Sequence, residues 1–257
     1  MINICKKIRI NYSFILLILL SLLSGLFRDI IVFIMIIIIH ELGHILLSLY
    51  FKWNIEYVKF SICGAFIIYN DDIDKNFYEE LILSISGVIF QNIIFSFFYL
   101  LNIYNIIDNN LFFIIYKYNI SITIFNLLPI IPLDGSKIVY VFLNMRFPYK
   151  LSLKILNLIS FISILLLSLF LIKNNKLEYS YIMILSFLLN KIYFFLKDIP
   201  YKYNRFLFER YKKPISIKKY EYIIGNDLSK MKRQKKHFFK INSKYYDERK
   251  LLSKKFD

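Results

Sequence analysis

Apolar residues in this chain are gathered into long blocks that contain few charges. Hydrophobic residues make up 58% of the 257 positions and aromatic residues 19%. Such a composition does not suit an ordinary soluble domain, in which most elements keep one polar face. A helix needs about 20 consecutive apolar residues to cross the hydrocarbon core of a bilayer, and the blocks approach this length. The chain is therefore predicted to be a multispanning membrane protein.

The blocks predict an all-α polytopic membrane protein with about six transmembrane helices. The expected spans lie at approximately 13–27, 29–51, 79–103, 111–128, 151–172 and 179–196. Between 53 and 74 the pattern changes to alternating β-branched and aromatic residues, which predicts a small β-hairpin inserted after the second span. A cleavable signal peptide is the alternative for the first block and would leave five spans.

Basic residues predict the orientation of these spans. Lys and Arg occur in the head, in 52–77, in 132–150 and in the tail, whereas 104–110 has none. Because loops rich in Lys and Arg stay on the cytoplasmic side, both termini are expected in the cytoplasm. The heavy use of Ile, Asn and Lys suggests a bacterial source. We therefore expect a multi-pass protein of a bacterial cell membrane.

The last part of the chain, 199–257, has a different composition from the membrane domain, 1–198. It holds 18 Lys and Arg against 6 Asp and Glu, so +12 of the net charge of +16 lies there. A basic cytoplasmic tail of this kind is attracted to anionic lipid headgroups. No module that reads or stacks nucleic acid is visible, and nucleic acid is not an expected partner. A small regulatory or substrate-docking module is the other interpretation.

The second block contains the sequence HELGH at 40–44, with two of the three histidines in the chain. Positions i and i+4 of a helix lie on one face, so His40 and His44 can bind one zinc ion. Glu41 lies beside the first histidine, where a carboxylate can act as a general base without binding the metal. Burying these groups in a membrane costs of order a few kcal/mol for the acid, so we expect a function for them.

A catalytic zinc site normally takes three protein ligands and leaves one position open. His237, in the tail, is not expected to reach the membrane. Asp134, at the end of an apolar block, is the better candidate. Pro129 and Pro132 break the helix before it and free backbone groups that need partners inside protein or beside a water-filled cavity. The alternative is that this aspartate belongs to a plain turn at a membrane exit.

HELGH in one span and NLLPIIPLDG (126–135) at the end of a later one resemble the motifs of the site-2 protease family of intramembrane metalloproteases. The resemblance covers about 10–200. It implies one zinc ion per chain, with Glu41 activating water and the following residues as ligands: His40, His44 and Asp134. HExxH within a membrane span is far more specific than the same motif in a soluble protein.

Other parts of the resemblance concern substrate. Asn126 matches an asparagine thought to position substrate or active-site groups, and Pro132 and Gly135 of the same motif are expected to share that role. Gly87 stands at the place of a small-residue motif in the third span. The pair Ser136 and Lys137 replaces the Gly-Arg that commonly follows in relatives. These departures concern substrate binding and leave the residues of the chemistry unchanged.

Within the family, the order and spacing of the motifs are most similar to its sporulation branch. That implies a membrane-associated substrate, the pro-form of a mother-cell sigma factor, cut near the cytoplasmic face. It implies inhibitory membrane partners of the BofA and stage IV FA type, and a place in the mother-cell membrane around the forespore. Relatives often end in a CBS domain. Here 205–211 resembles its linker and 235–241 one of its strands, so the tail is expected to be a truncated or degenerate version.

Two other functions stay open on the sequence alone. A membrane hydrolase acting on a lipid or small molecule would keep the zinc and change the substrate. A non-proteolytic metal-binding protein, either a transporter or a degenerate protease scaffold, needs no base beside its first ligand. A transporter would also be expected to show ligands in several spans. Glu41 and the few ligands beyond Asp134 therefore favour a zinc metalloendopeptidase.

Overall fold

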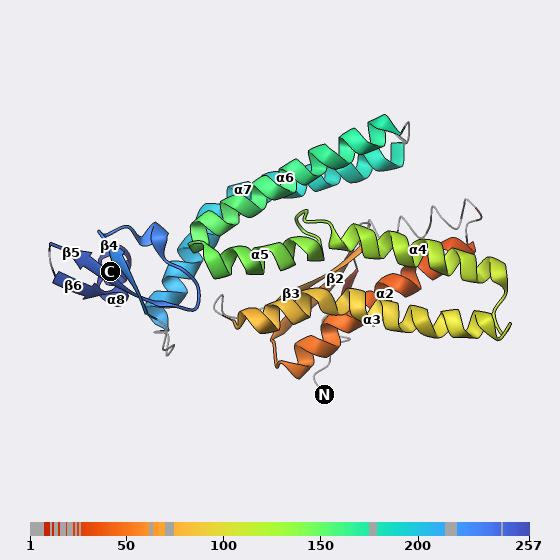
Figure 1. The fold of residues 1–257 in the computed structure, drawn as a ribbon, viewed down its shortest axis with the longest axis horizontal. Helices are drawn as coiled ribbons and strands as arrows, with labels where there is room; N and C mark the ends of the chain where they lie inside the picture. Colours follow the sequence, from red (N-terminus) through yellow and green to blue (C-terminus); the bar gives the residue numbers. More distant parts are fainter. Residues whose placement is uncertain are drawn as a thin grey trace. The chain divides into compact units, whose positions relative to one another are not determined.

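The computed structural model describes residues 8–10, 27–61, 64–69, 75–174, 179–213, 220–242 and 244–257, with single residues between 12 and 25. The chain divides into two compact units, which are described separately. The first consists of Met1–Asp71 and Ile82–Leu127, and the second of Asp72–Leu81 and Leu128–Asp257. Helices make up most of the described residues in both (Figure 1).

The first unit packs helices around an apolar core. Its helices are α2 (Phe27–Tyr50), most of α3 (Phe77–Ile103) and α4 (Asn109–Leu127). Buried side chains recur about one or two helical turns apart along the inner faces of α2 and α4: Val32, Ile36 and Ile37 on α2, and Ile115 and Ile122 on α4. This spacing follows from the helical repeat, which puts such positions on one side. The face that they form carries the histidines one further turn along α2.

A small sheet lies in the same unit. Strands β2 (Ile55–Ser61) and β3 (Gly64–Tyr69) pair antiparallel, which confirms the predicted hairpin. Strand β1 (Ile8–Ile10) pairs parallel with β2, so the order is β1-β2-β3. The sequence did not predict β1, because three residues are too few to show an alternating pattern.

The second unit begins with three consecutive helices: α5 (Asp134–Arg146), α6 (Tyr149–Lys173) and α7 (Tyr179–Lys212). Helix α7 contains Pro200 and continues through residue 198, where the sequence predicts the change from membrane domain to tail. The first residues of α3 also belong to this unit. Tyr149 and Leu153 of α6 pack with Phe206 and Leu207 of α7 in a buried apolar cluster.

Residues 220–257, here called the C-terminal module, form a folded part of this unit. The module consists of β4 (Tyr220–Ile224), η2 (Leu228–Lys230), β5 (Lys236–Ile241), β6 (Lys244–Asp247) and α8 (Glu248–Phe256). The sheet order is β4-β5-β6. Met231, Phe239 and Leu252 are completely buried in the cluster that α6 and α7 share. The segment is therefore folded and is not a plain solvated tail, whereas its attraction to anionic lipid headgroups and its likeness to a degenerate CBS domain stay predictions.

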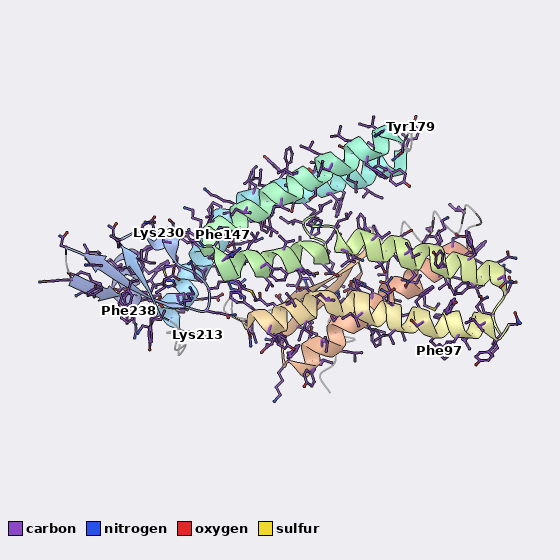
Figure 2. The ribbon with its side chains drawn as sticks, in the orientation of Figure 1. Phe97, Phe147, Tyr179, Lys213, Lys230 and Phe238 are labelled. Atoms are coloured by element: carbon purple, nitrogen blue, oxygen red, sulfur yellow. The ribbon has the colours of Figure 1, made fainter. Side chains whose placement is uncertain are left out.

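Three of the described helices, α2, α3 and α6, are long and apolar enough to cross a membrane. Their outward side chains are large and apolar, such as Phe97 on α3, which is 58% exposed and labelled in Figure 2, and Phe170 on α6. Hydrocarbon covers such surfaces at no cost. Helices α4 and α7 coincide with two further expected spans, and the first block lies mostly outside the described residues. The total of six spans stays a prediction.

Candidate metal centre

Helix α2 presents His40, Glu41 and His44 to the interior of the first unit. Their exposed fractions are 3%, 8% and 4%, whereas Leu42 between them is 41% exposed. The helix is apolar on its outer side as well, so the polar groups are the ones turned away from lipid. Ionisable groups in membrane helices face inward because hydrocarbon offers them no partner. The structure confirms the predicted placement of the two histidines on one helical face.

The two imidazoles meet at their Nε2 atoms. The distance from His40 Nε2 to His44 Nε2 is 3.2 Å, and the rings are inclined by 75°. At the other side of each ring, Nδ1 lies against oxygen atoms of α3. His44 Nδ1 is 2.8 Å from the carbonyl oxygen of Leu83 and 3.0 Å from Ser86 Oγ, and His40 Nδ1 is 3.0 Å from Gln91 Oε1.

These partners determine where the protons are. A carbonyl oxygen only accepts hydrogen bonds, so Nδ1 of His44 donates to Leu83, and Nδ1 of His40 donates to the side-chain carbonyl of Gln91. In the neutral rings both Nε2 atoms then carry a lone pair. Two lone pairs 3.2 Å apart repel each other unless a cation or a shared proton lies between them. Histidines that bind metals are held in this way, with the second nitrogen donating to an oxygen.

Two glycines allow α3 to approach this side of α2. A Cβ atom on Gly43 would lie 2.7 Å from the Ser86 carbonyl oxygen, so a larger residue would push the helices apart. A Cβ atom on Gly87 would lie 2.4 Å from His44 Nε2 and 2.6 Å from His40 Nε2. The volume in front of both Nε2 atoms is thus bounded by a residue without a side chain. The donor set fits a metal ion such as Zn²⁺, which binds imidazole nitrogen.

Asp134 lies in the second unit, at the first position of α5, and is 5% exposed. The turn before it contains a cis peptide bond between Ile131 and Pro132. Ser160 of α6 holds this turn, because its Oγ lies 3.2 Å from the Ile131 amide nitrogen and 3.3 Å from the Pro129 carbonyl oxygen. The backbone groups freed by the prolines are thus bonded inside the protein, as expected from the sequence.

The carboxylate of Asp134 forms an ion pair of 2.7 Å with Lys137, whose side chain is half exposed. Asp134 is thus a buried carboxylate that the fold holds in place. Like the two histidines, it is a buried residue able to offer one ligand atom to a metal ion. The structure brings the two histidines together in the first unit and places the aspartate in the second.

The three residues expected to position substrate lie along the same motif. Asn126 is half-buried near the end of α4, Pro132 is half-buried in the turn, and Gly135 is buried in the first turn of α5. Their roles toward substrate stay predictions. The sequence reasoning missed Gln91 as a partner of His40. An uncharged amide inside an apolar helix was the signal that could have found it, because such groups need partners in a membrane.

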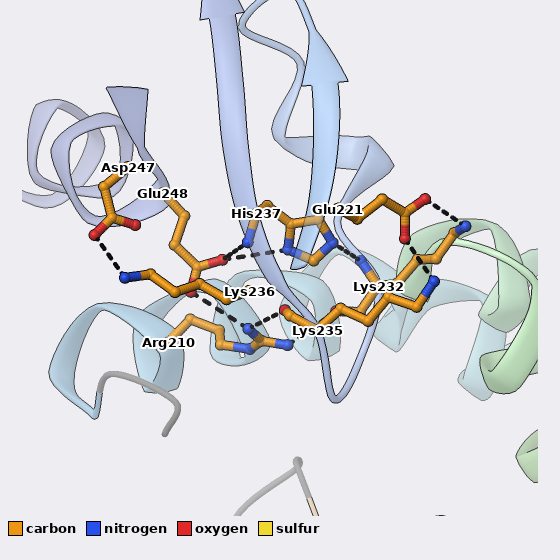
Figure 3. A network of polar contacts seen from close by, with 8 residues as sticks. All are labelled: Arg210, Glu221, Lys232, Lys235, Lys236, His237, Asp247 and Glu248. Atoms are coloured by element: carbon orange, nitrogen blue, oxygen red, sulfur yellow. Dashed lines mark hydrogen bonds and ion pairs between the residues drawn. The ribbon is translucent and has the colours of Figure 1, made fainter. Parts of the chain in front are cut away.

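The third histidine lies elsewhere and is held differently. His237 on β5 is completely buried in the C-terminal module. Its Nδ1 is 3.2 Å from Glu248 Oε2, and its Nε2 accepts a hydrogen bond of 3.1 Å from the Lys232 amide. Figure 3 shows this network together with Arg210, which pairs with the other oxygen of Glu248. Both nitrogens of His237 therefore bond to groups of the C-terminal module.

Comparisons with known proteins bear on this site. Residues 102–170 match Peptidase family M50. Stage IV sporulation protein FB of Bacillus subtilis (strain 168) is 30% identical over 193 residues, which cover 75% of this chain and 67% of that protein. The site-2 protease from Methanocaldococcus jannaschii is similar in fold, with a TM-score of 0.56, 24% identity, and coverage of 72% of this chain and 88% of that one.

Proposed function

The chain belongs to peptidase family M50, the site-2 proteases, and from that membership we propose that it is a zinc-dependent intramembrane endopeptidase. The observation that carries the proposal is the pair of buried imidazoles whose Nε2 atoms converge at 3.2 Å with both Nδ1 atoms engaged by α3. Glu41 lies beside this pair on the same helix, as a general base requires. A site that only stores or carries a metal needs no such carboxylate.

We propose His40, His44 and Asp134 as the residues that hold the zinc ion, one per chain. Asp134 is included because it is buried, acidic and held by a turn that the fold supports. Zinc in such a site lowers the pKa of water and polarises a carbonyl group. Glu41 takes the proton from the attacking water and returns it to the leaving amine. The buried surroundings of these residues keep bulk water away from the reacting groups.

The small sheet offers a way to hold substrate. A transmembrane helix must unwind before cleavage, because its own hydrogen bonds shield the peptide carbonyls, and an extended peptide can add to the edge of a sheet. Strand β3 is at one end of the described sheet order. Its Tyr69 hydroxyl lies 2.9 Å from Ser48 Oγ, and Ser48 donates to the carbonyl oxygen of His44. The strand is thus tied to the helix one turn after the second histidine.

For the substrate we propose a membrane-associated pro-protein cut near the cytoplasmic face. A sporulation sigma factor precursor is the specific candidate, supported by the 30% identity to stage IV sporulation protein FB. Inhibitory membrane partners of the BofA and stage IV FA type and a place in the mother-cell membrane belong to the same proposal. The basic tail, with 18 Lys and Arg, would hold anionic lipid headgroups or an acidic soluble part of the substrate at the surface.

Co-expression with membrane-tethered pro-proteins tests the enzymatic claim. The original chain is expected to release a shortened product, and Glu41→Gln to lower the rate by about 100-fold or more, because a general base typically contributes 10²–10⁴-fold. Glu56→Gln, on an exposed carboxylate of β2, serves as the matched control and should process normally. Equal processing by the original chain and Glu41→Gln would refute the protease. Zinc retained without any processing would favour the scaffold or transporter.

A further inference from the structure

We propose that Gln91 is a positioning residue for the metal site, which holds His40 in the tautomer and orientation that bind the ion. This inference rests on the metal site of the proposed function and concerns a residue that contacts the proposed ligand His40. Gln91 lies on α3, 51 positions from the histidine, and is 2% exposed. A buried amide in an apolar span is costly unless each of its polar atoms is bonded. Its contacts are therefore informative.

The surroundings of Gln91 determine which way its amide points. Its Nε2 lies 3.0 Å from the backbone carbonyl oxygen of Asn119 and 2.9 Å from the side-chain oxygen of the same residue. The backbone oxygen only accepts, so the nitrogen of the amide has to be on that side. Thr123 Oγ1, at 3.1 Å, is a third partner there. The Oε1 atom is thereby directed to His40, whose Nδ1 must donate to it.

Asn119, the partner of the Gln91 amide, is itself held by further hydrogen bonds. Asn119 is 3% exposed, and its Nδ2 donates to Asn92 Oδ1 at 3.2 Å. Asn92 in turn donates to the Val88 carbonyl oxygen at 2.8 Å. The network therefore connects α4 to α3, and α3 to the histidine on α2. All of its side chains are uncharged, so an oxygen is presented to the imidazole without a buried charge.

The two histidines differ in what holds them. The Nδ1 atom of His44 is bonded to a backbone carbonyl, which no substitution of Leu83 removes. The Nδ1 atom of His40 is bonded to a side chain, that of Gln91. Partners of this kind around a metal site typically change metal affinity or activity by 10- to 100-fold when they are mutated. Gln91 is therefore the position at which a single substitution should alter the metal site without removing a ligand.

Zinc competition with a chelator tests the proposal on the full chain purified in detergent micelles. We expect Gln91→Leu to weaken zinc binding by about 10- to 100-fold. Gln91→Glu keeps an oxygen acceptor and should bind zinc more tightly than Gln91→Leu. Asn92→Leu is the matched control, because it removes a neighbouring amide of the same network that does not touch the histidine. Equal affinities in Gln91→Leu and the original chain, or equal losses in Gln91→Leu and Asn92→Leu, would overturn the proposal.

Nitrogen NMR of the metal-free chain, labelled at histidine, gives a second readout. The chain has three histidines, so the signals of His40 are assignable with one His40→Ala variant. The expected form is Nδ1-protonated in the original chain and a mixture of tautomers in Gln91→Leu. An Nε2-protonated His40 in the original chain would refute the proposal. If the Gln91 effects are present but no protein is cleaved, the proposed function fails and this inference stands.

Discussion

The histidines of α2 and the histidine of the C-terminal module are all buried, but their ring nitrogens have different partners. In the first unit, each ring uses one nitrogen for the fold and turns the other toward its neighbour, which leaves two Nε2 atoms 3.2 Å apart. In the module, His237 uses Nδ1 toward Glu248 and Nε2 toward the Lys232 amide. Burial alone therefore does not indicate a functional histidine. The two kinds of histidine differ instead in how many ring nitrogens bond to backbone or side-chain groups other than a second histidine.

The polar networks around these histidines differ in charge. Amides and a hydroxyl support His40, from Gln91, Asn119 and Thr123. In the module, charged groups surround the ring, and Arg210 pairs with Glu248 with side-chain exposures of only 1% and 5%. Neutral groups satisfy hydrogen bonds without the desolvation cost of a charge, which is severe in a lipid-surrounded helix.

Removal of each histidine should separate the two regions most clearly. We expect His44→Ala to reduce zinc affinity by more than about 100-fold, because losing a ligand costs more than losing a partner of a ligand. His237→Ala should leave zinc affinity unchanged and destabilise the C-terminal module, since it removes the ring that accepts from the Lys232 amide and lies against Glu248 Oε2. Chelator competition measures the first effect, and hydrogen exchange in residues 220–257 the second. Zinc loss in His237→Ala would break the comparison.

The second largest effect is expected from removing the carboxylate of Glu248, the buried acid of the module. We expect Glu248→Ala to destabilise the module by about 3–5 kcal/mol, because it leaves the Arg210 guanidinium buried without its charge partner. The control is Glu209→Ala, which breaks a more exposed pair with Arg205 and should cost less than about 1 kcal/mol. Denaturant unfolding followed by hydrogen exchange in the module compares the two. Equal losses would mean that the buried pair contributes no more than the surface pair.

Lowering the pH should reproduce part of the loss of module stability expected in Glu248→Ala. Burial raises the pKa of Glu248, but the hydrogen bonds from His237 and the charge of Arg210 outweigh it, so the pKa lies below the ordinary 4.5. A carboxylate with a lowered folded-state pKa contributes stability above its unfolded-state pKa and loses it as the pH falls through the folded-state value. The module is therefore expected to open below about pH 4.5, and Glu248→Ala should flatten this dependence. An unchanged pH profile in the variant would assign the acid sensitivity to other carboxylates.

Much of the architecture is legible in the sequence. The apolar blocks predict α2, α3 and α6 because crossing a bilayer sets a minimum length of apolar helix. The alternation around Gly64 predicts the hairpin of β2 and β3 because side chains of a strand point alternately to its two faces. Strand β1 and the fold of the C-terminal module escaped prediction. Strand β1 pairs with the distant strand β2, and the module packs its buried side chains against α6 and α7, and no local pattern records either contact.

For the metal centre, the sequence by itself determined that His40 and His44 share one face of a helix, because positions i and i+4 lie about one turn apart. It also determined that Glu41 follows the first histidine directly. Only the tertiary structure decided which nitrogen of each ring faces the other histidine. The partners that consume each Nδ1 come from α3, 39 and 51 positions away. Gly87 has no Cβ atom that would clash with the Nε2 atoms. The reason is that helical periodicity sets directions along one element, whereas hydrogen bonds between elements depend on how those elements pack.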